Sequence, residues 1–194
     1  AIQNEFLPFG SPFLGLFALV PLYYAISKSS SFLESGLLVG LQISITNLIS
    51  SFWLGYFHGF AIFTLGGTTI AYFIFGFIFG HFFYLPFCKN PQKDFFRLCG
   101  IQGSKVTIRI LFFSSLWVIF EWFKSNGFLA YPWGTLSMTA FKWQFITQIA
   151  SITGTYGISF LFALFSSIIG EGLTLLPIQI HNQSRKVSSC YSKC

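Results

Sequence analysis

The sequence predicts an all-α fold, a polytopic membrane helix bundle with about five transmembrane helices. Hydrophobic residues make up 54% of the chain and charged residues 8%, whereas about a quarter of the residues of an ordinary soluble domain are charged. Five apolar stretches come close to, or exceed, the roughly 20 residues that a helix needs to cross a bilayer. A soluble domain of 194 residues cannot hide 28 phenylalanines, so we expect the surrounding solvent to be lipid.

The five predicted spans cover residues 11–27, 36–57, 60–86, 106–124 and 144–176. Pro12 and Pro21 interrupt the first span, although proline is tolerated in a membrane when neighbouring groups satisfy the freed carbonyl. Residues 1–180 are expected to form the transmembrane domain, and residues 181–194 a basic cytoplasmic tail.

Pairs of glycines four residues apart indicate where helices approach closely. These pairs are Gly36/Gly40, Gly55/Gly59 and Gly76/Gly80. Because bulky phenylalanines surround most of them, they favour tight packing over a pore.

Basic residues in short loops predict the orientation of the spans. Five of them lie in the segment from Cys88 to Arg109 against a single acid, Asp94, and such clusters stay in the cytoplasm. They are Lys89, Lys93, Arg97, Lys105 and Arg109. The alternation of spans then places Lys28 and the tail inside, and the turn at His58 and the loop 124–143 outside. Aromatic residues expected to anchor the outer ends are Trp53, Tyr56, Trp117, Trp122, Tyr131, Trp133 and Trp143.

Several function classes find no support in these residues. The net charge of +6 comes from lysines and arginines that mostly lie between apolar runs, so no nucleic acid partner is expected. The four cysteines have no zinc-ligand spacing and are interpreted as free thiols, and the three histidines lie far apart near membrane boundaries. We therefore expect no metal, no cofactor and no catalytic residue within this chain.

Glu121 and Lys124 are the most informative pair, because the helix from Val106 carries Glu121 about 22 Å along its axis, close to the outer face. They share one helical face. The pair is either an interfacial ion pair that ends the helix or a group facing a lipid or partner.

Two further segments are candidates for contact with lipid or a partner. Tyr131, Pro132 and Trp133 form a rigid aromatic turn that either steers an acyl chain or anchors the loop. Gln148 and Tyr156 stand among hydrogen-bonding groups at the start of the last span, where interhelical hydrogen bonds are the simpler interpretation.

Four ordered motifs resemble the membrane part of apolipoprotein N-acyltransferases. They are LGLFALVPLY from Leu14, SFWLGYFHGF from Ser51, LWVIFEWFK before YPWG, and QIASITGTYGISF from Gln148. Each motif alone is weak, but the four occur in order over nearly the whole chain.

The resemblance implies a multi-pass protein of the bacterial inner membrane that takes part in lipoprotein maturation. In that family a periplasmic domain of the nitrilase type uses a Glu, Lys and Cys triad to move an acyl chain from a phospholipid to the N-terminal cysteine of a diacylglyceryl-lipoprotein. None of the triad can be carried over onto these 194 residues, so we expect the chain to be a truncated part, inactive alone. Implied partners are membrane phospholipid, the lipoprotein and a separate nitrilase-like catalytic half.

Some residues depart from the family pattern. Lys124 stands in place of the usual Arg, Tyr131 in place of Phe, and Ser137 to Ala140 in place of Gly-Tyr-Ser-Gln. Lysine keeps the positive charge but loses the planar fork of arginine. Two other classes stay open: a structural or interaction protein of the membrane, and a small transporter, for which no internal repeat is visible.

Overall fold

The computed structural model describes residues 12–53, 61–87, 105–126, 134–141 and 143–191, with the backbone alone for residues 12, 61, 62 and 177–191. Its described residues form helices and no strand, which confirms the predicted all-α class. Four helices are long and apolar enough to cross a membrane, and a shorter apolar segment covers Phe13–Lys28. The chain is therefore a multi-pass membrane protein.

The first predicted span is divided in two. Helix α1 covers Pro12–Phe17 and α2 covers Val20–Lys28, with Pro21 in the first turn of α2. Proline suits a first helical turn because its missing N–H would have no partner there. The break explains why Phe13–Lys28 is shorter than the other apolar segments.

Helices α3 (Phe32–Ser50) and α4 (Ala61–Tyr84) form the most extensive helix pair of the bundle. Helix α3 begins four residues before the predicted start at 36, because Ser31 caps it: its side chain accepts a hydrogen bond from the Glu34 N–H at 3.2 Å. A short 3₁₀ turn, η2 (Leu85–Phe87), follows α4.

The predicted glycine packing is confirmed between α3 and α4. A methyl group placed on Gly80 would lie 2.6 Å from the Gly36 Cα, and one placed on Gly76 would lie 3.0 Å from the Gly40 Cα. The two backbones approach so closely only because neither side carries a Cβ. Gly55 and Gly59 lie outside the described residues.

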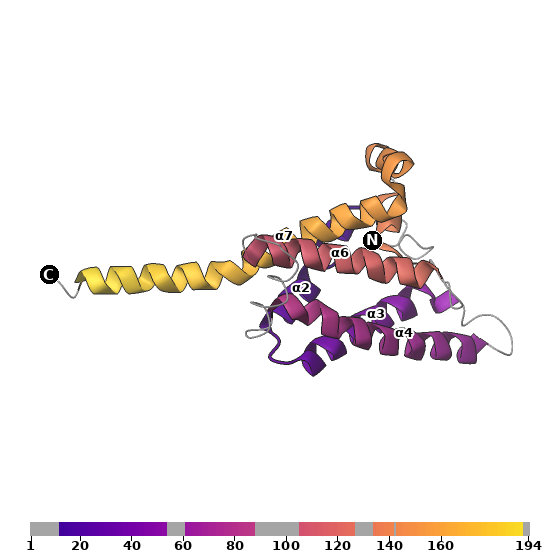
Figure 1. Ribbon diagram of the computed structural model, residues 1–194, viewed down its shortest axis with the longest axis horizontal. Helices are drawn as coiled ribbons and strands as arrows, with labels where there is room; N and C mark the ends of the chain where they lie inside the picture. Colours follow the sequence, from indigo (N-terminus) through magenta and orange to yellow (C-terminus); the bar gives the residue numbers. More distant parts are fainter. Residues whose placement is uncertain (1–11, 54–60, 88–104, 127–133, 142, 192–194) are drawn as a thin grey trace, which may run out of the picture.

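Helices α6 (Lys105–Ser125) and α7 (Gln144–Tyr191) form the second large pair and lie side by side in Figure 1. Arg109 contacts Glu171, and the hydroxyl oxygens of Ser114 and Ser167 lie 3.3 Å apart. Residue numbers therefore rise along α6 as they fall along α7, and the two helices are antiparallel. A 3₁₀ turn, η3 (Leu136–Ala140), precedes α7.

The predicted span 144–176 coincides with the apolar stretch Gln144–Leu176, but its helix is broken at Gly154. This residue has φ 70° and ψ 179°, which is not helical, and it divides α7 into two helical pieces. Only glycine adopts such angles without strain, because it has no Cβ. Figure 1 shows the first turns of α7, in orange, standing away from the long part of the helix.

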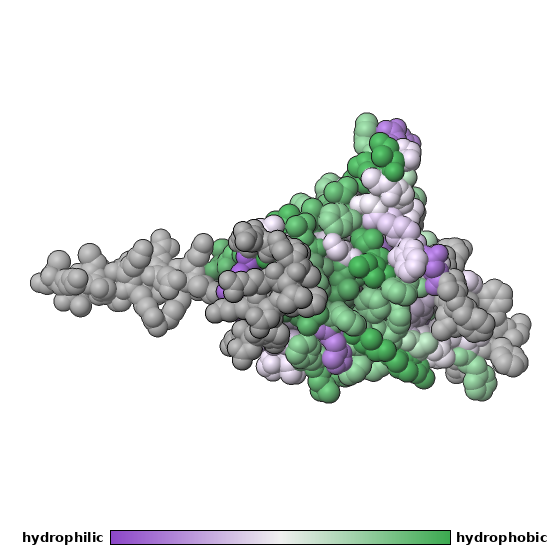
Figure 2. Space-filling model, viewed as in Figure 1, coloured by the Kyte–Doolittle hydropathy of each residue, from purple (hydrophilic) through white to green (hydrophobic). Residues whose placement is uncertain are grey.

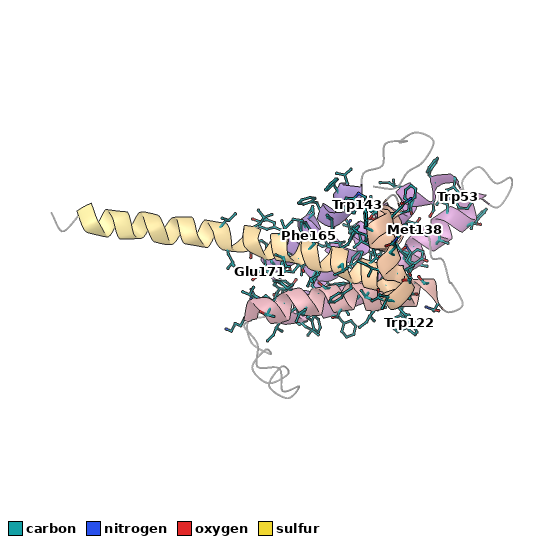
Figure 3. All side chains as sticks on the ribbon, turned by 90° about the horizontal axis from the view of Figure 1, so that it is seen from above. Trp53, Trp122, Met138, Trp143, Phe165 and Glu171 are labelled. Atoms are coloured by element: carbon teal, nitrogen blue, oxygen red, sulfur yellow. The ribbon has the colours of Figure 1, made fainter. Side chains whose placement is uncertain are left out.

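The outside of the bundle suits lipid. Large apolar side chains are exposed on every long helix, for example Ile49 on α3, Ile70 on α4 and Ile168 on α7. Figure 2 shows a mainly hydrophobic middle, with hydrophilic residues gathered toward the ends. In Figure 3, Trp53, Trp122 and Trp143 lie at one end of the bundle and Glu171 toward the other. Trp117 is an exception to the predicted anchors, because it is buried between helices.

The helix ends are arranged as alternating spans require. Ser35 at the start of α3 donates to the Gly80 carbonyl near the end of α4, at 2.8 Å. Arg109 near the start of α6 donates to the Pro86 carbonyl, at 3.2 Å. One end of the bundle thus collects the start of α3, the end of α4 and the start of α6; which end faces the cytoplasm stays a prediction from the basic loop.

Candidate functional site

Glu121 ties the end of α6 to the turn that precedes α7. Its Oε1 accepts a hydrogen bond from the Trp117 Nε1–H at 3.1 Å and another from the Leu136 backbone N–H at 2.6 Å. The carboxylate is only 2% exposed, and these two donors offset part of the cost of burying it. Glu121 therefore holds η3 against α6.

Helix α7 contributes to the same junction through Ser159. The Ser137 N–H donates to the Ser159 Oγ at 3.2 Å, so η3 is held from both sides. Since Ser159 is fully buried, this contact lies inside the bundle. The result is a rigid corner formed by α6, η3 and α7.

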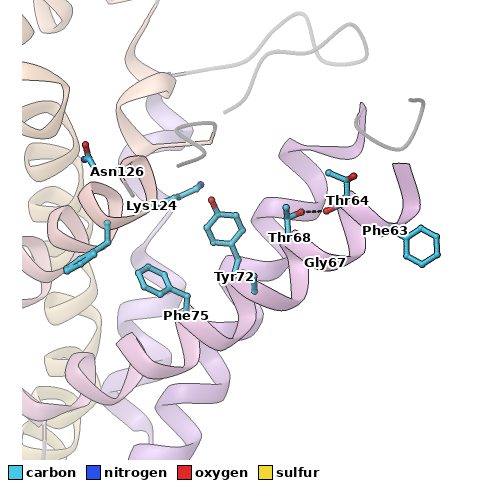
Figure 4. A pocket seen from close by; sticks show the side chains of 10 residues that line it. Phe63, Thr64, Gly67, Thr68, Tyr72, Phe75, Lys124 and Asn126 are labelled. Atoms are coloured by element: carbon cyan, nitrogen blue, oxygen red, sulfur yellow. Dashed lines mark hydrogen bonds between the residues drawn. The ribbon is translucent and has the colours of Figure 1, made fainter. Parts of the chain in front are cut away.

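Lys124 lies one helical turn after Glu121 and is 7% exposed. Its ammonium interacts electrostatically with Glu121 and lies 5.4 Å from the centre of the Tyr72 ring on α4. Figure 4 shows the side chain extending from α6 toward Tyr72. The charge therefore lies between α4 and α6.

Gly134 closes the other side of Lys124. With φ 72° it has a conformation that favours glycine, and a Cβ placed on it would lie 3.1 Å from the Ser50 Oγ and 3.7 Å from the Lys124 Nζ. A Cβ would crowd the Ser50 hydroxyl and would make an ordinary contact with the Lys124 ammonium. The positive φ is therefore the main reason for a glycine at this position.

Two cavities open on either side of Lys124. One, of about 390 Å³, lies between α4 and α6 and is seen in Figure 4; its lining residues are Phe63, Thr64, Gly67, Thr68, Ala71, Tyr72, Phe75, Phe123, Lys124 and Asn126. The other, of about 260 Å³, lies between α3, α6 and η3, and Glu121 also lines it. Mostly apolar walls with a few polar groups and one cation are chemically suited to an amphiphile that carries an anionic group.

The structure places the predicted candidates as follows. It brings Glu121 and Lys124 together. Tyr156 is half-buried at the same end, where its hydroxyl accepts a hydrogen bond from the Asn126 Nδ2 at 3.4 Å. Gln148 is exposed on the piece of α7 before Gly154. Tyr131, Pro132 and Trp133 lie outside the described residues.

Sequence reasoning missed a second buried polar cluster, at the opposite end of the bundle. The Tyr23 hydroxyl donates to the Glu171 Oε2 at 2.6 Å, and Arg109 forms an ion pair with the Glu171 Oε1 at 3.3 Å. Tyr23 is fully buried and Glu171 is 2% exposed. The available signal was Glu171 itself, a carboxylate inside a predicted span, where acids are rare and almost always paired.

No group of three or more His, Cys, Asp or Glu side chains is placed to hold a metal ion in the part of the chain that the structure describes. His81 instead contacts its own helix, with its Nδ1 2.8 Å from the Phe77 carbonyl oxygen. His58 lies outside the described residues.

Comparison with known proteins gives one consistent family. Residues 4–168 match the family model described as the apolipoprotein N-acyltransferase N-terminal domain. The chain is 40% identical over 172 residues to apolipoprotein N-acyltransferase 2 of Treponema denticola, and 41% identical over 173 residues to apolipoprotein N-acyltransferase 2 of Treponema pallidum. It is 32% identical over 176 residues to apolipoprotein N-acyltransferase of Borreliella burgdorferi.

These alignments cover 89% of the chain but only 30%, 28% and 30% of the three relatives, so the chain spans less than a third of their length. No solved structure matches it. The matched region includes helices α1, α2, α3, α4 and α6, the turn η3 and most of the membrane-spanning part of α7, with Glu121 and Lys124 inside it. The chain therefore belongs to the apolipoprotein N-acyltransferase family and corresponds to its N-terminal membrane domain.

Proposed function

We propose that this chain is the membrane part of an apolipoprotein N-acyltransferase of the bacterial inner membrane. Its task is to present a phospholipid acyl donor to a nitrilase-type catalytic half, which transfers the acyl chain to the N-terminal cysteine of a diacylglyceryl-lipoprotein. The observation that carries this proposal is the family match over residues 4–168. The exposed apolar helices support it, because a membrane-embedded protein has direct access to a lipid donor.

The lipid-holding role is assigned to the end of the bundle with Lys124. The larger cavity there, at about 390 Å³, is within the size range of small-molecule sites, about 300–1,000 Å³. Apolar side chains from α4 and α6 would surround an acyl chain, and the Lys124 ammonium would face the phosphate. Lysine binds phosphate as a point charge, so the Arg-to-Lys departure keeps this role.

The 194 residues alone are proposed to transfer no acyl group. Acyl transfer through a thioester needs a thiolate beside a base and donors for the developing oxyanion. The described helices bring Glu121 and Lys124 together, but no cysteine is placed beside them in the described part of the chain. The corner is a binding and positioning element in this proposal.

The test is complementation of cells depleted of their own apolipoprotein N-acyltransferase, with N-acylation of lipoproteins measured by mass spectrometry of the N-terminal peptide. We expect no N-acylation with the 194 residues alone, and N-acylation when the nitrilase-type half of a relative is co-expressed. Lys124→Gln should lower the co-expressed activity several-fold, whereas Lys105→Gln, at an exposed position, should leave it unchanged.

Two results would contradict the proposal. Rescue by the 194 residues alone, lost when one cysteine is replaced by serine, would reveal an active site within this chain. Failure of every co-expressed catalytic half, with both proteins present in the membrane, would argue that the chain does not serve this reaction.

A further inference from the structure

The ten residues 144–153, before Gly154, are not needed for α7 to cross the membrane. Residues 155–176 alone make a helix about 33 Å long, at about 1.5 Å per residue, and the hydrocarbon core is about 30 Å thick. The apolar stretch Gln144–Leu176 is therefore longer than a span requires. The surplus is the piece that Gly154 turns away from the span.

This surplus piece has two faces. Phe145, Ile149 and Ile152 follow helical spacing on one side, and Phe145 and Ile152 are each 88% exposed, the highest exposure among the large apolar side chains described. Gln144, Gln148 and Ser151 occupy a different side and are exposed as well. In Figure 2 this segment, above the bundle, carries both hydrophobic and hydrophilic side chains.

A third side fixes the piece to the bundle. Ile146 and Ala150 are partly buried and pack against the core cluster. Trp143, immediately before the helix, contacts the Phe13 ring at 4.8 Å and the Phe162 ring at 6.4 Å between centroids. The piece is thus an attached helix with one apolar face uncovered.

The position of that face indicates what covers it. Trp143 lies with Trp53 and Trp122 at one end of the bundle, where tryptophans settle among lipid headgroups (Figure 3). After Gly154, Leu161 and Phe165 are exposed on the span itself, as lipid-facing side chains would be.

The backbone at Gly154 is suited to such a turn. A Cβ placed there would meet nothing within 4 Å, so steric crowding is not the reason for a glycine at this position. The reason is the backbone conformation. With φ 70° and ψ 179°, the residue redirects the chain between the surface and the span.

We propose that residues 144–153 form an interfacial helix that lies in the headgroup region of the leaflet at the Trp53, Trp122 and Trp143 end. Phe145, Ile149 and Ile152 enter the upper acyl region, and Gln148 and Ser151 face water. The partner is the lipid surface itself. This inference does not depend on the proposed function, since it concerns lipid contact and not acyl transfer.

Depth measurements on the full chain test the proposal. The four native cysteines are replaced by serine, and single cysteines are introduced as Phe145→Cys, Ile152→Cys, Gln148→Cys and Ser151→Cys, with Phe165→Cys as the mid-span control. Each is labelled with an environment-sensitive fluorophore in phosphatidylcholine and phosphatidylglycerol vesicles. Quenching is compared between iodide in water and nitroxide lipids labelled at shallow or deep positions.

We expect shallow nitroxide lipids to quench positions 145 and 152 at least three-fold more than 148 and 151, and iodide to show the reverse order. Position 165 should respond to the deep nitroxide. Equal iodide quenching at all four positions would overturn the proposal, as would a depth at 145 and 152 equal to that at 165. Protection of 145 and 152 from both quenchers would also overturn it, because protein would then cover the face.

A second measurement addresses the turn. Gly154→Ala should change the quenching at positions 145 and 152, because alanine does not adopt this backbone conformation without strain. Gly172→Ala is the matched control: Gly172 is helical, and a Cβ there meets nothing within 4 Å. If Gly154→Ala leaves all depths unchanged, the turn does not position the helix.

Discussion

The Tyr23 side chain shows how one hydroxyl can connect three helices. It donates to Glu171 on α7, which also binds Arg109 on α6, while its ring contacts Phe113 on α6 at 5.0 Å between centroids. In hydrocarbon a carboxylate is costly unless paired, so the hydroxyl and the guanidinium together make Glu171 tolerable inside the bundle.

Tyr23→Phe is expected to lower the free energy of unfolding by about 1–2 kcal/mol, because it removes a hydrogen bond to a charged group while it keeps the ring. Thermal unfolding in detergent micelles measures the change. The neighbouring Tyr24→Phe is the control, since Tyr24 is 39% exposed, and it should leave the midpoint unchanged. Equal effects of the two variants would mean that the bond to Glu171 contributes little.

Among single residues, the sequence placed Glu121 and Lys124 on one helical face but did not indicate which other groups they contact. A charged residue within an apolar run can be recognised in any sequence. Glu171 could have been recognised in the same way. The donors to Glu121 could not be predicted, because Leu136 contributes a backbone N–H and Trp117 was expected among the interfacial anchors and not inside the bundle. Such contacts depend on the tertiary arrangement, which hydropathy does not describe.

At the scale of helices, α3 and α4 form a pair held by backbone proximity. Gly36 faces Gly80, and Gly40 faces Gly76, so the two backbones come into contact at these positions. The spacing of four residues was sufficient to predict this, because it places both glycines of a helix on one face.

Gly80→Ala is expected to destabilise the chain by about 1–3 kcal/mol, because the new methyl group would meet the backbone of α3, which cannot move aside cheaply. Gly67→Ala on the same helix has no neighbour within 4 Å and should keep or slightly raise the stability. Thermal unfolding midpoints of the two variants and the unchanged chain, measured in detergent micelles, check both expectations. A midpoint for Gly80→Ala at or above that of Gly67→Ala would refute the close contact.

Helices α4 and α6 begin and end within two residues of the predicted 60–86 and 106–124. Helix α3 covers Phe32–Ser50, so the predicted bounds 36–57 were wrong at both ends, and the cap at Ser31 explains the earlier start. The break at Gly154 was not predicted. A lone glycine in a helical apolar pattern is compatible with a continuous packed helix, and only its φ value distinguishes the two cases. Pro21 indicated that the first span is interrupted. It did not indicate that the interruption, at Ala18 and Leu19, produces two short helices in place of one.

At the scale of the whole molecule, the helix ends alternate between two sides, and the basic loop assigns the sides. We expect Cys88, Cys99, Cys190 and Cys194 to face the cytoplasm, because positively charged loops resist translocation. A membrane-impermeant maleimide added to intact cells should label none of them. Asn126→Cys, at the other end of the bundle, should be labelled, and ready labelling of Cys88 from outside would reverse the topology.

The pairing of Glu171 also has a consequence for biosynthesis. A ribosome makes the chain from its N-terminus, so Tyr23 and Arg109 have already emerged when Glu171 leaves the exit tunnel. When Glu171 enters the bilayer, its hydrogen-bond donor, Tyr23, and its cationic partner, Arg109, are therefore already present. The carboxylate does not remain unpaired until a later helix is inserted. Both partners of the acid thus precede it along the chain.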